Sequence, residues 1–349
     1  MTQSKRHADG SLTVGTGTAH PGEIVRCQIP LGQELCGSDS SIPLILVNGA
    51  HKGPILWLNG GTHGDEPEGA VAILKLLERI DPSVLHGAIV ACPAMNPRAF
   101  EISSRGNPLD PFAYDMNRIY PGSAVGQPTE RVAAAHWKAM DPACDLQINF
   151  HAGGNEMYIA EMLFVPDTPA CLEMAAAMGP ACSLIVPIPS GDGNPSSKLA
   201  ESGRAAVGIE LGGPVGCLGK GIHEAGERLR DITLNLMRHY GMIGDTPRYA
   251  ESWSFGHLMP VLSPCSGLWL SQPGLRLLEP TPAGTRIGTM FSLHGEAQCE
   301  VVTPCDGTIA GLRTQPQTFA GQHLVFFVAS DSVRTDLLTA SVPQNASQS

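Results

Sequence analysis

The sequence predicts an α/β fold, with a mainly parallel mixed sheet flanked by helices, followed by a smaller all-β domain. Two observations support this prediction. Short apolar runs alternate with segments of helical spacing over most of the chain, a pattern typical of a parallel sheet covered by helices. From about Tyr249 the pattern changes to short segments broken by Gly and Pro. We therefore expect an α/β domain over residues 23–248 and a β-rich domain over residues 249–338.

The first of these domains divides into predicted strands and helices. Val71, Leu74 and Leu77 recur within Gly69–Ile80 at the spacing of one helix face. Because parallel strands carry function at their carboxyl ends, we expect a site in the loops that follow the strands. The further predicted helices are Thr129–Met140 and Gly226–Tyr240, and the predicted strands are Ile42–Val47, Ile55–Leu58, Ala88–Cys92, Leu146–Phe150 and Val207–Leu211.

The β-rich region and the chain ends are less informative. Pro304-Cys-Asp-Gly307, which follows the Ala283–Gly288 segment, resembles the half-barrel of biotinyl and lipoyl carrier domains. No lysine follows Lys220, so biotin or lipoate cannot be attached there through lysine, and a structural or pocket-covering role is favoured. Residues 1–22 are polar and Gly-rich and residues 339–349 are small and polar, which predicts a flexible arm and a flexible tail.

Composition excludes several classes of partner. The net charge of -11 repels phosphate backbones and anionic lipid surfaces, so we expect no nucleic-acid or membrane partner. The chain contains no uncharged apolar run of the roughly 18 residues that a membrane span needs, and no apolar run follows its first basic residues. The ten cysteines form no CxxC pair, which favours a reduced setting. We expect a cytoplasmic protein that acts on a small molecule; a homo-oligomer is compatible with the sequence, which leaves the oligomeric state open.

Residues at the ends of two predicted strands have the chemistry of a metal site. His63 and Glu66 stand three positions apart in a Gly-flanked loop, and His151 directly follows an apolar strand. Two imidazoles and one carboxylate leave one coordination position of zinc for water or substrate, the arrangement of a catalytic site. The HxxE spacing alone arises easily by chance, so an ordinary loop histidine is the alternative reading at this point.

Four motifs in order resemble one enzyme family. The segment Gly60–Gly69, GGTHGDEPEG, closely resembles the first metal motif of the succinylglutamate desuccinylase and aspartoacylase family, which has the wider zinc carboxypeptidase-like fold. The resemblance spans roughly residues 40–215. It implies an amide hydrolase with one zinc ion per subunit, held by His63, Glu66 and His151. The other matching segments are Asn96-Pro97 with Arg105 and Asp115–Gly122, Asn149-Phe-His151, and Ile209–Gly212.

The same resemblance implies roles for further residues. Glu210 would act as general base and acid, and Arg105 would hydrogen-bond the carbonyl oxygen as it becomes an oxyanion. Asn117 and Arg118 would hold a substrate carboxylate, because a guanidinium fork matches two carboxylate oxygens. The alternatives are a salt-bridged surface glutamate, solvated arginines, and a structural ion pair between Arg118 and Asp115.

The substrate of such an enzyme is left open by the sequence. The gap between Arg105 and Asn117 is longer than we expect for aspartoacylase itself, and the chain looks closer to bacterial deacylases that include deacetylases of N-acetylated diamino acids. We therefore expect hydrolysis of a small N-acyl amino acid, with the acyl group, the amine portion and the metal identity undetermined.

Three other functions remain as alternatives. A metallocarboxypeptidase would use the same metal and glutamate on short peptides. A nucleophilic hydrolase is disfavoured because the chain has no GxSxG motif and Cys92 and Cys144 lie in structural contexts. A non-catalytic metal-binding protein would not need Glu210.

Overall fold

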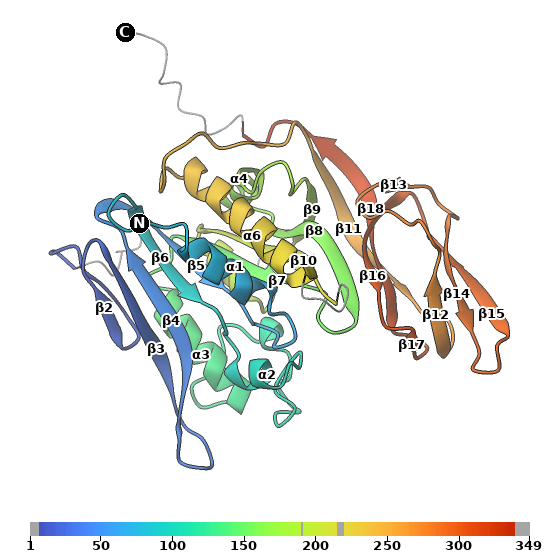
Figure 1. The fold of residues 1–349 in the computed structure, drawn as a ribbon, viewed down its shortest axis with the longest axis horizontal. Coiled ribbons are helices and arrows are strands. Elements are labelled where there is room, and N and C mark those ends of the chain that lie inside the picture. Colours follow the sequence, from blue (N-terminus) through green and yellow to red (C-terminus); the bar gives the residue numbers. More distant parts are fainter. Residues whose placement is uncertain (1–6, 190, 215–219, 339–349) are drawn as a thin grey trace, which may run out of the picture.

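The computed structural model describes residues 7–189, 191–214 and 220–338 (Figure 1). A twelve-stranded sheet runs through these residues in the order β13-β16-β18-β11-β9-β8-β10-β7-β5-β6-β4-β3. Its strands up to residue 212 are β3 (Glu23–Gln33), β4 (Asp39–Asn48), β5 (His51–Asn59), β6 (His86–Cys92), β7 (Leu146–His151), β8 (Met157–Pro166), β9 (Leu184–Ile188) and β10 (Ala205–Gly212).

Parallel and antiparallel pairs are combined in this sheet. Strand β5 runs parallel to β6 and β7, and β10 runs parallel to β7, so the carboxyl ends of these strands meet at one edge. Strand β8 is antiparallel to β10, and β3, β4 and the strands after residue 253 add further antiparallel pairs. The predicted mixed α/β fold is confirmed. The sheet contains more antiparallel strand pairs than the alternation of strands and helices in the sequence predicted.

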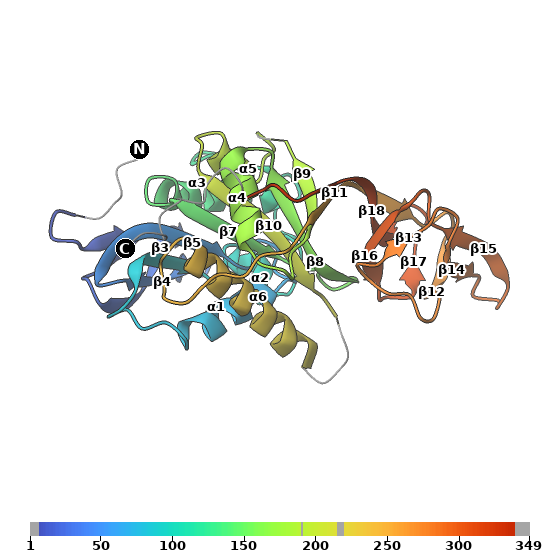
Figure 2. The same ribbon diagram turned by 90° about the horizontal axis from the view of Figure 1, so that it is seen from above.

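Helices cover both faces of the sheet. Helix α1 (Glu68–Leu77) and helix α6 (Lys220–His239) pack beside each other on one face with α4 (Pro169–Ala177), around a core that includes Ile73, Leu229 and Leu236. Helix α3 (Pro128–Met140) packs on a second core, and Figure 2 shows it on the other side of the sheet from α1 and α6. The helices predicted at 69–80, 129–140 and 226–240 are confirmed, with α6 beginning six residues earlier.

The amino-terminal part of the chain differs from the prediction. We expected residues 1–22 to be a flexible arm, but β1 (Leu12–Val14) and β2 (Gly17–Ala19) form an antiparallel pair. Leu12, Val14 and Ala19 are buried in the core that α3 covers. The expectation of a loose arm is wrong for this pair of strands, because alternate small apolar residues give it a face to bury. Residues 1–6 and the predicted tail at 339–349 lie outside the described residues.

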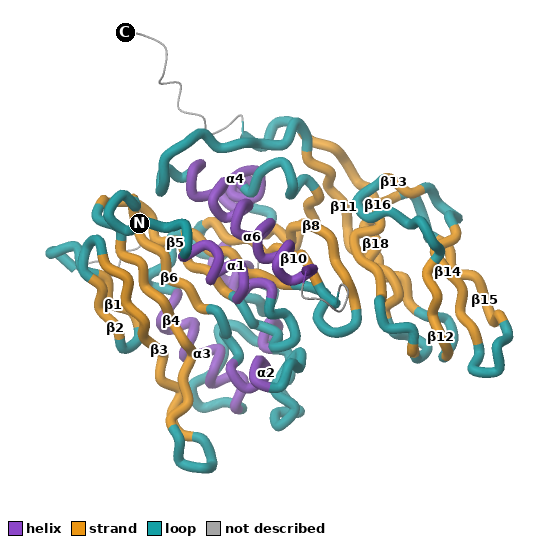
Figure 3. The backbone as a smooth tube through the Cα atoms, in the orientation of Figure 1, coloured by secondary structure: helices purple, strands orange, loops and turns teal. Residues whose placement is uncertain are grey.

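Strands make up the secondary structure after α6 in the described part of the chain (Figure 3). They divide between two sheets: β11, β13, β16 and β18 continue the twelve-stranded sheet, and β12, β14, β15 and β17 form a four-stranded one. Because β11 pairs with β9 and β16 pairs with β8, the sheet continues past residue 249, and a separate β-rich domain stays a prediction. These strands are β11 (Trp253–Leu262), β12 (Gly267–Ser271), β13 (Pro280–Thr281), β14 (Arg286–Phe291), β15 (Ala297–Val302), β16 (Gly307–Arg313), β17 (Gln317–Thr318) and β18 (His323–Arg334). Among the described helices, none is long and apolar enough to cross a membrane.

A buried histidine ties α3 to the sheet. His136 is fully buried; its Nε2 lies 3.0 Å from Asn59 Oδ1, and the Tyr120 hydroxyl lies 3.1 Å from its Nδ1. Trp57 donates its indole N–H to the same Asn59 oxygen at 2.8 Å. The neutral ring, with its proton on Nε2, satisfies each of these contacts. Burial lowers the pKa of His136 to about 3, so the ring is neutral at pH 7.

This histidine should make the fold sensitive to acid. Its folded pKa lies below the ordinary value of 6.5, so the unfolded chain binds the extra proton first as pH falls, and stability is lost from about pH 6.5 towards pH 3. The loss is about 1.4 kcal/mol for each pH unit. In urea unfolding between about pH 4 and 7, His136→Gln should remove the part of the pH dependence of the free energy of unfolding that His136 causes. This holds whatever the absolute stability of the variant. Parallel pH profiles for the two proteins would contradict the assignment.

Candidate functional site

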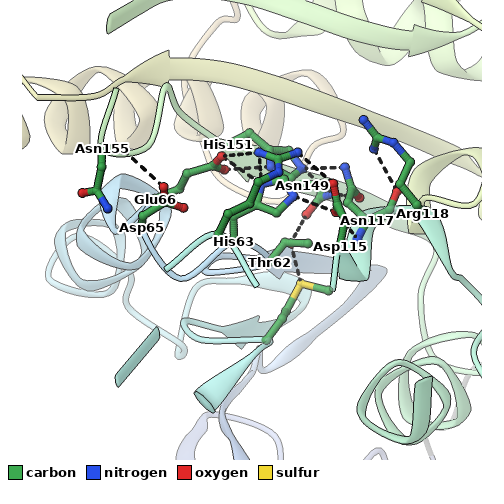
Figure 4. A network of polar contacts seen from close by, with 12 residues as sticks. Thr62, His63, Asp65, Glu66, Asp115, Asn117, Arg118, Asn149, His151 and Asn155 are labelled. Atoms are coloured by element: carbon green, nitrogen blue, oxygen red, sulfur yellow. Dashed lines mark hydrogen bonds and ion pairs between the residues drawn. The ribbon is translucent and has the colours of Figure 1, made fainter. Parts of the chain in front are cut away.

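The predicted metal ligands meet at the carboxyl ends of β5 and β7 (Figure 4). His63 and Glu66 lie in the loop between β5 and α1, and His151 ends β7. Gly64 lets this loop pack closely, since a Cβ there would lie 2.0 Å from the Ala99 backbone. All three candidate ligand side chains are buried, with 3%, 4% and 5% of their surfaces exposed.

One carboxylate joins the two imidazoles. Glu66 Oε1 lies 2.8 Å from His63 Nδ1, and Glu66 Oε2 lies 2.9 Å from His151 Nδ1. One ligand atom from each residue lies within 4.8 Å of the others. Two imidazole nitrogens and a carboxylate oxygen converging at a buried point fit the donor set that zinc and other first-row divalent ions prefer.

The second ring nitrogen of each histidine has a partner of its own. His63 Nε2 lies 3.1 Å from Asp115 Oδ1, so a neutral His63 ring carries its proton on Nε2 and turns the lone pair of Nδ1 towards the cluster. The Asn149 side chain lies 2.8 Å from His151 Nε2, and Thr62 donates its hydroxyl to Asn149 at 3.0 Å. Such partners orient the rings, as they do around ligand histidines in metal sites.

The electrostatics of the cluster follow from its buried charges. Burial lowers the pKa of His63, but the charge of Glu66 and the hydrogen bond that His63 donates to Asp115 outweigh it and raise this pKa to about 9. Burial would raise the pKa of Glu66, yet the two histidines hold it below its usual range. Burial also lowers the pKa of His151. The ionised Glu66 carboxylate therefore lies between the two rings, balanced by a protonated His63 and by Arg105.

Arg105 lies beside this cluster, as the sequence motif predicted. Its Nη1 is 3.7 Å from Glu66 Oε1, and its Nη2 donates to Asp115 Oδ2 at 2.9 Å. Asp115 thus contacts both Arg105 and His63. Among the described residues Asp115 pairs with His63 and Arg105, and no ion pair between Asp115 and Arg118 is seen.

Asn117 and Arg118 lie on a short 3-10 helix, η1 (Met116–Arg118), whose first turn is capped by the Asp115 side chain. Asn117 Nδ2 lies 3.4 Å from His151 Nε2, which places Asn117 against the metal cluster. Arg118 lines the same cavity, and its Nη1 donates to the Asn117 carbonyl at 3.1 Å. Figure 4 shows Arg118 on the side of the histidine cluster opposite Asp65 and Glu66.

Glu210 lies on β10, directly across from His151 in the parallel ladder. Its Oε2 is buried and has no hydrogen-bond partner among the described residues. Burial raises the pKa of Glu210 well above its usual value, and the nearby charge of Glu66 raises it further. The side chain lines the cavity and is free to exchange a proton there.

These residues open onto a cavity of about 880 Å³. Every predicted site residue lines it: His63, Glu66, Arg105, Asn117, Arg118, His151 and Glu210. The sequence did not indicate the opposite wall, whose side chains come from β8, β9, β11 and β18, because only the folded sheet brings these segments together. That wall includes Ile159, Phe164, Ile188, Leu258 and Phe326.

Comparison with known proteins gives consistent relatives. Residues 52–240 match the family model described as the succinylglutamate desuccinylase/aspartoacylase catalytic domain. The chain is 29% identical over 285 residues to the N-alpha-acetyl-L-2,4-diaminobutyric acid deacetylase of Halomonas elongata, covering 78% of this chain and 81% of that one.

Solved structures share the fold. A product-bound ectoine utilization protein from Ruegeria pomeroyi has a TM-score of 0.77 at 20% identity, covering 92% of this chain and 99% of its own. A succinylglutamate desuccinylase from a Silicibacter species has a TM-score of 0.75 at 21% identity, covering 88% and 95%.

Removing the partner of His63 should weaken metal binding. We expect Asp115→Ala to lower the affinity for Zn²⁺ by roughly 10- to 100-fold, because His63 loses the group that fixes its ring. Competition with a chromophoric chelator measures this. Asp81→Ala is the control, since that carboxylate is exposed and bonds only the nearby Ser83. Equal affinities in the two variants would show that Asp115 does not support the ligand set.

Proposed function

The chain belongs to the succinylglutamate desuccinylase and aspartoacylase family, and from this premise we propose that it is a cytoplasmic, zinc-dependent deacylase of small N-acyl amino acids. The buried cluster of His63, Glu66 and His151, which opens into a cavity shared with Arg105 and Glu210, carries the proposal. The named activity of the Halomonas relative supports amide hydrolysis as the reaction.

His63, Glu66 and His151 would hold one zinc ion per subunit. When bound, the ion supplies a Lewis acid for the amide carbonyl and lowers the pKa of a water molecule towards neutrality. The contact of Asp115 with His63 Nε2 supports this ligand set, because a neutral His63 ring then presents the lone pair of Nδ1 to the cluster. His151 Nδ1 lies beside the other oxygen of Glu66.

Glu210 is proposed as the group that moves the proton. A general base must accept a proton from the attacking water and then deliver it to the leaving nitrogen. The Glu210 side chain lines the cavity across from His151, and its Oε2 atom has no hydrogen-bond partner among the described residues. A carboxyl whose pKa is raised by burial holds the accepted proton long enough to donate it near neutral pH.

Arg105 is proposed as the donor to the carbonyl oxygen. A fixed cation stabilises the negative charge that develops on this oxygen during attack. The ion pair with Asp115 holds the guanidinium in position, and its Nη1 faces the ligand cluster. Its position beside Glu66 therefore supports the role.

Arg118, with Asn117, is proposed to bind the carboxylate of the amino acid portion. The guanidinium lies on the cavity wall, beyond the metal cluster as seen from Glu66 (Figure 4). A bidentate pair with a carboxylate would fix the amide at a set distance from the catalytic groups. A metallocarboxypeptidase acting on peptides needs an open groove, and the side chains of β11 and β18 along the cavity favour a small substrate instead.

Loss of the Glu210 carboxylate should stop catalysis without emptying the metal site. For Glu210→Gln we expect kcat to fall by about 10²- to 10⁴-fold, because water is no longer deprotonated. Zinc content should be unchanged. Glu161→Gln is the control: Glu161 is a buried glutamate on the neighbouring strand, but its carboxylate pairs with Arg228 of α6. Activity of Glu210→Gln comparable with this control would reject the mechanism.

The carboxylate-binding role of Arg118 has a substrate-based test. Arg118→Gln should raise KM for an N-acetyl amino acid by roughly 10- to 100-fold, since a hydrogen bond to a charged group is lost. The corresponding N-acetyl amino acid amide, which has no carboxylate, should be hydrolysed equally by both proteins. Arg131→Gln, at an exposed site on α3, controls for the loss of a positive charge. If the variant loses as much with the amide as with the acid, Arg118 does not bind the carboxylate.

A further inference from the structure

One wall of the cavity is apolar, and neither the metal site nor the proton transfer uses it. We name the side chains of Ile159, Phe164, Ile188, Leu258 and Phe326 the apolar wall. They come from β8, β9, β11 and β18, which are neighbours in the sheet. Phe164, Leu258 and Phe326 pack on a core cluster of their own but are only partly buried, because they face the cavity.

The apolar wall lies beside the proposed carboxylate anchor. Ile188 ends β9, and the chain that follows it packs against Arg118, since a Cβ at Gly193 would lie 2.0 Å from the Arg118 carbonyl oxygen. The Tyr120 N–H also donates to the Gly193 carbonyl at 2.8 Å. The segment that follows Ile188 thus lies against the backbone of Arg118, and both Ile188 and Arg118 line the cavity.

Space for that side chain remains at the floor of the cavity. Gly208 lines the cavity two residues before Glu210, on the same face of β10. A Cβ at Gly208 would meet Phe164 Cβ only at 3.6 Å, an ordinary contact distance. The absence of a side chain at this position leaves the face of the apolar wall open to a ligand.

The apolar wall itself carries no charged group, and the carboxylates that line the cavity lie on other residues. Glu156 pairs with the buried Arg313 at 2.6 Å. Asp192 is exposed and accepts from the Gly193 N–H at 2.9 Å. Asp65 accepts from the Asn155 N–H at 3.2 Å through Oδ2, and its Oδ1 has no partner among the described residues. A cationic side chain placed on the apolar wall would lose its hydration without a counter-charge on the wall itself, which is unfavourable.

We propose that the apolar wall binds the side chain of the substrate's amino acid portion, and that this side chain is bulky and apolar, of the leucine, methionine or phenylalanine class. The inference rests on the proposed deacylase function and specifies its substrate. It sets this chain apart from the Halomonas relative, whose named substrate carries a second amino group.

The zinc-loaded full-length protein is tested on two substrate series. In the first series the acyl group is acetyl and the amino acid is leucine, methionine, phenylalanine, alanine, aspartate or 2,4-diaminobutyrate. In the second the amino acid is glycine and the acyl group lengthens from acetyl to hexanoyl. We expect kcat/KM for the three bulky apolar amino acids to exceed that for the other three by about tenfold or more, since each methylene in a fitted pocket contributes at least that much.

Two variants test the apolar wall itself. Gly208→Val fills the floor beside Phe164 and should lower the ratio of kcat/KM for N-acetylleucine over N-acetylalanine by about tenfold. Leu258→Asp places a carboxylate on the apolar wall and should shift the ratio of N-acetylleucine over Nα-acetyl-2,4-diaminobutyrate towards the diamino acid by about as much. Leu270→Asp, the same substitution at an exposed position in the four-stranded sheet, should leave both ratios unchanged. Thermal unfolding verifies that each variant is folded.

The outcomes separate the two levels of the proposal. If neither series is hydrolysed at all, the deacylase function fails and the substrate inference fails with it. Hydrolysis of N-acetylalanine at the same kcat/KM as N-acetylleucine overturns the substrate inference alone. A preference that appears only when the acyl group is lengthened also overturns it, because the apolar wall would then receive the acyl portion. Ratios that respond to Gly208→Val and Leu258→Asp but not to Leu270→Asp support it.

Discussion

The carboxylate of Glu66 is the group around which the site is arranged. Its two oxygens bond the rings of His63, in the loop after β5, and of His151, the last residue of β7. A buried carboxylate is costly unless cations or donors surround it. The imidazoles and the guanidinium of Arg105 meet this requirement, and Asp115 in turn holds Arg105 and the far side of His63. The loops after β5 and β7 must therefore come together for the fold to bury this charge.

The sheet, more than the loops, sets the distances at the site. His151 and Glu210 face each other in the parallel ladder of β7 and β10, so the spacing of strands fixes how far the proposed base lies from the ligand cluster. Asn59 and Asn149 are paired in the same way between β5 and β7. Side chains carried on strands in a fixed register keep their geometry better than side chains on free loops. The strands thus hold His151 and Glu210 at a fixed separation, which the proposed proton transfer requires.

Much of this arrangement could be predicted from the sequence, and the exceptions have physical causes. The strands and helices up to residue 240 have local periodicity, and the family resemblance places His63, Glu66, Arg105 and Glu210 around one cavity. Strand β8 was missed; it carries Glu161 in the middle of an apolar stretch, and this charge pairs with Arg228 on a helix distant in the sequence. The β1–β2 pair was missed because its few apolar residues acquire a core only when the sheet is assembled. The contact of Asp115 with His63 joins residues 52 positions apart, which spacing alone does not reveal.

The cavity combines two sets of residues that the chain encodes separately. The ligand cluster and its supporting residues lie between residues 62 and 151, whereas the apolar wall is drawn from four strands that end at residue 334. A mutation on the apolar wall therefore leaves the contacts of Glu66 untouched. Over evolutionary time, relatives with the same fold could exchange one amine portion for another by small steps along those strands, each intermediate remaining an active enzyme. The separation of the two segments makes the substrate range the feature most open to divergence.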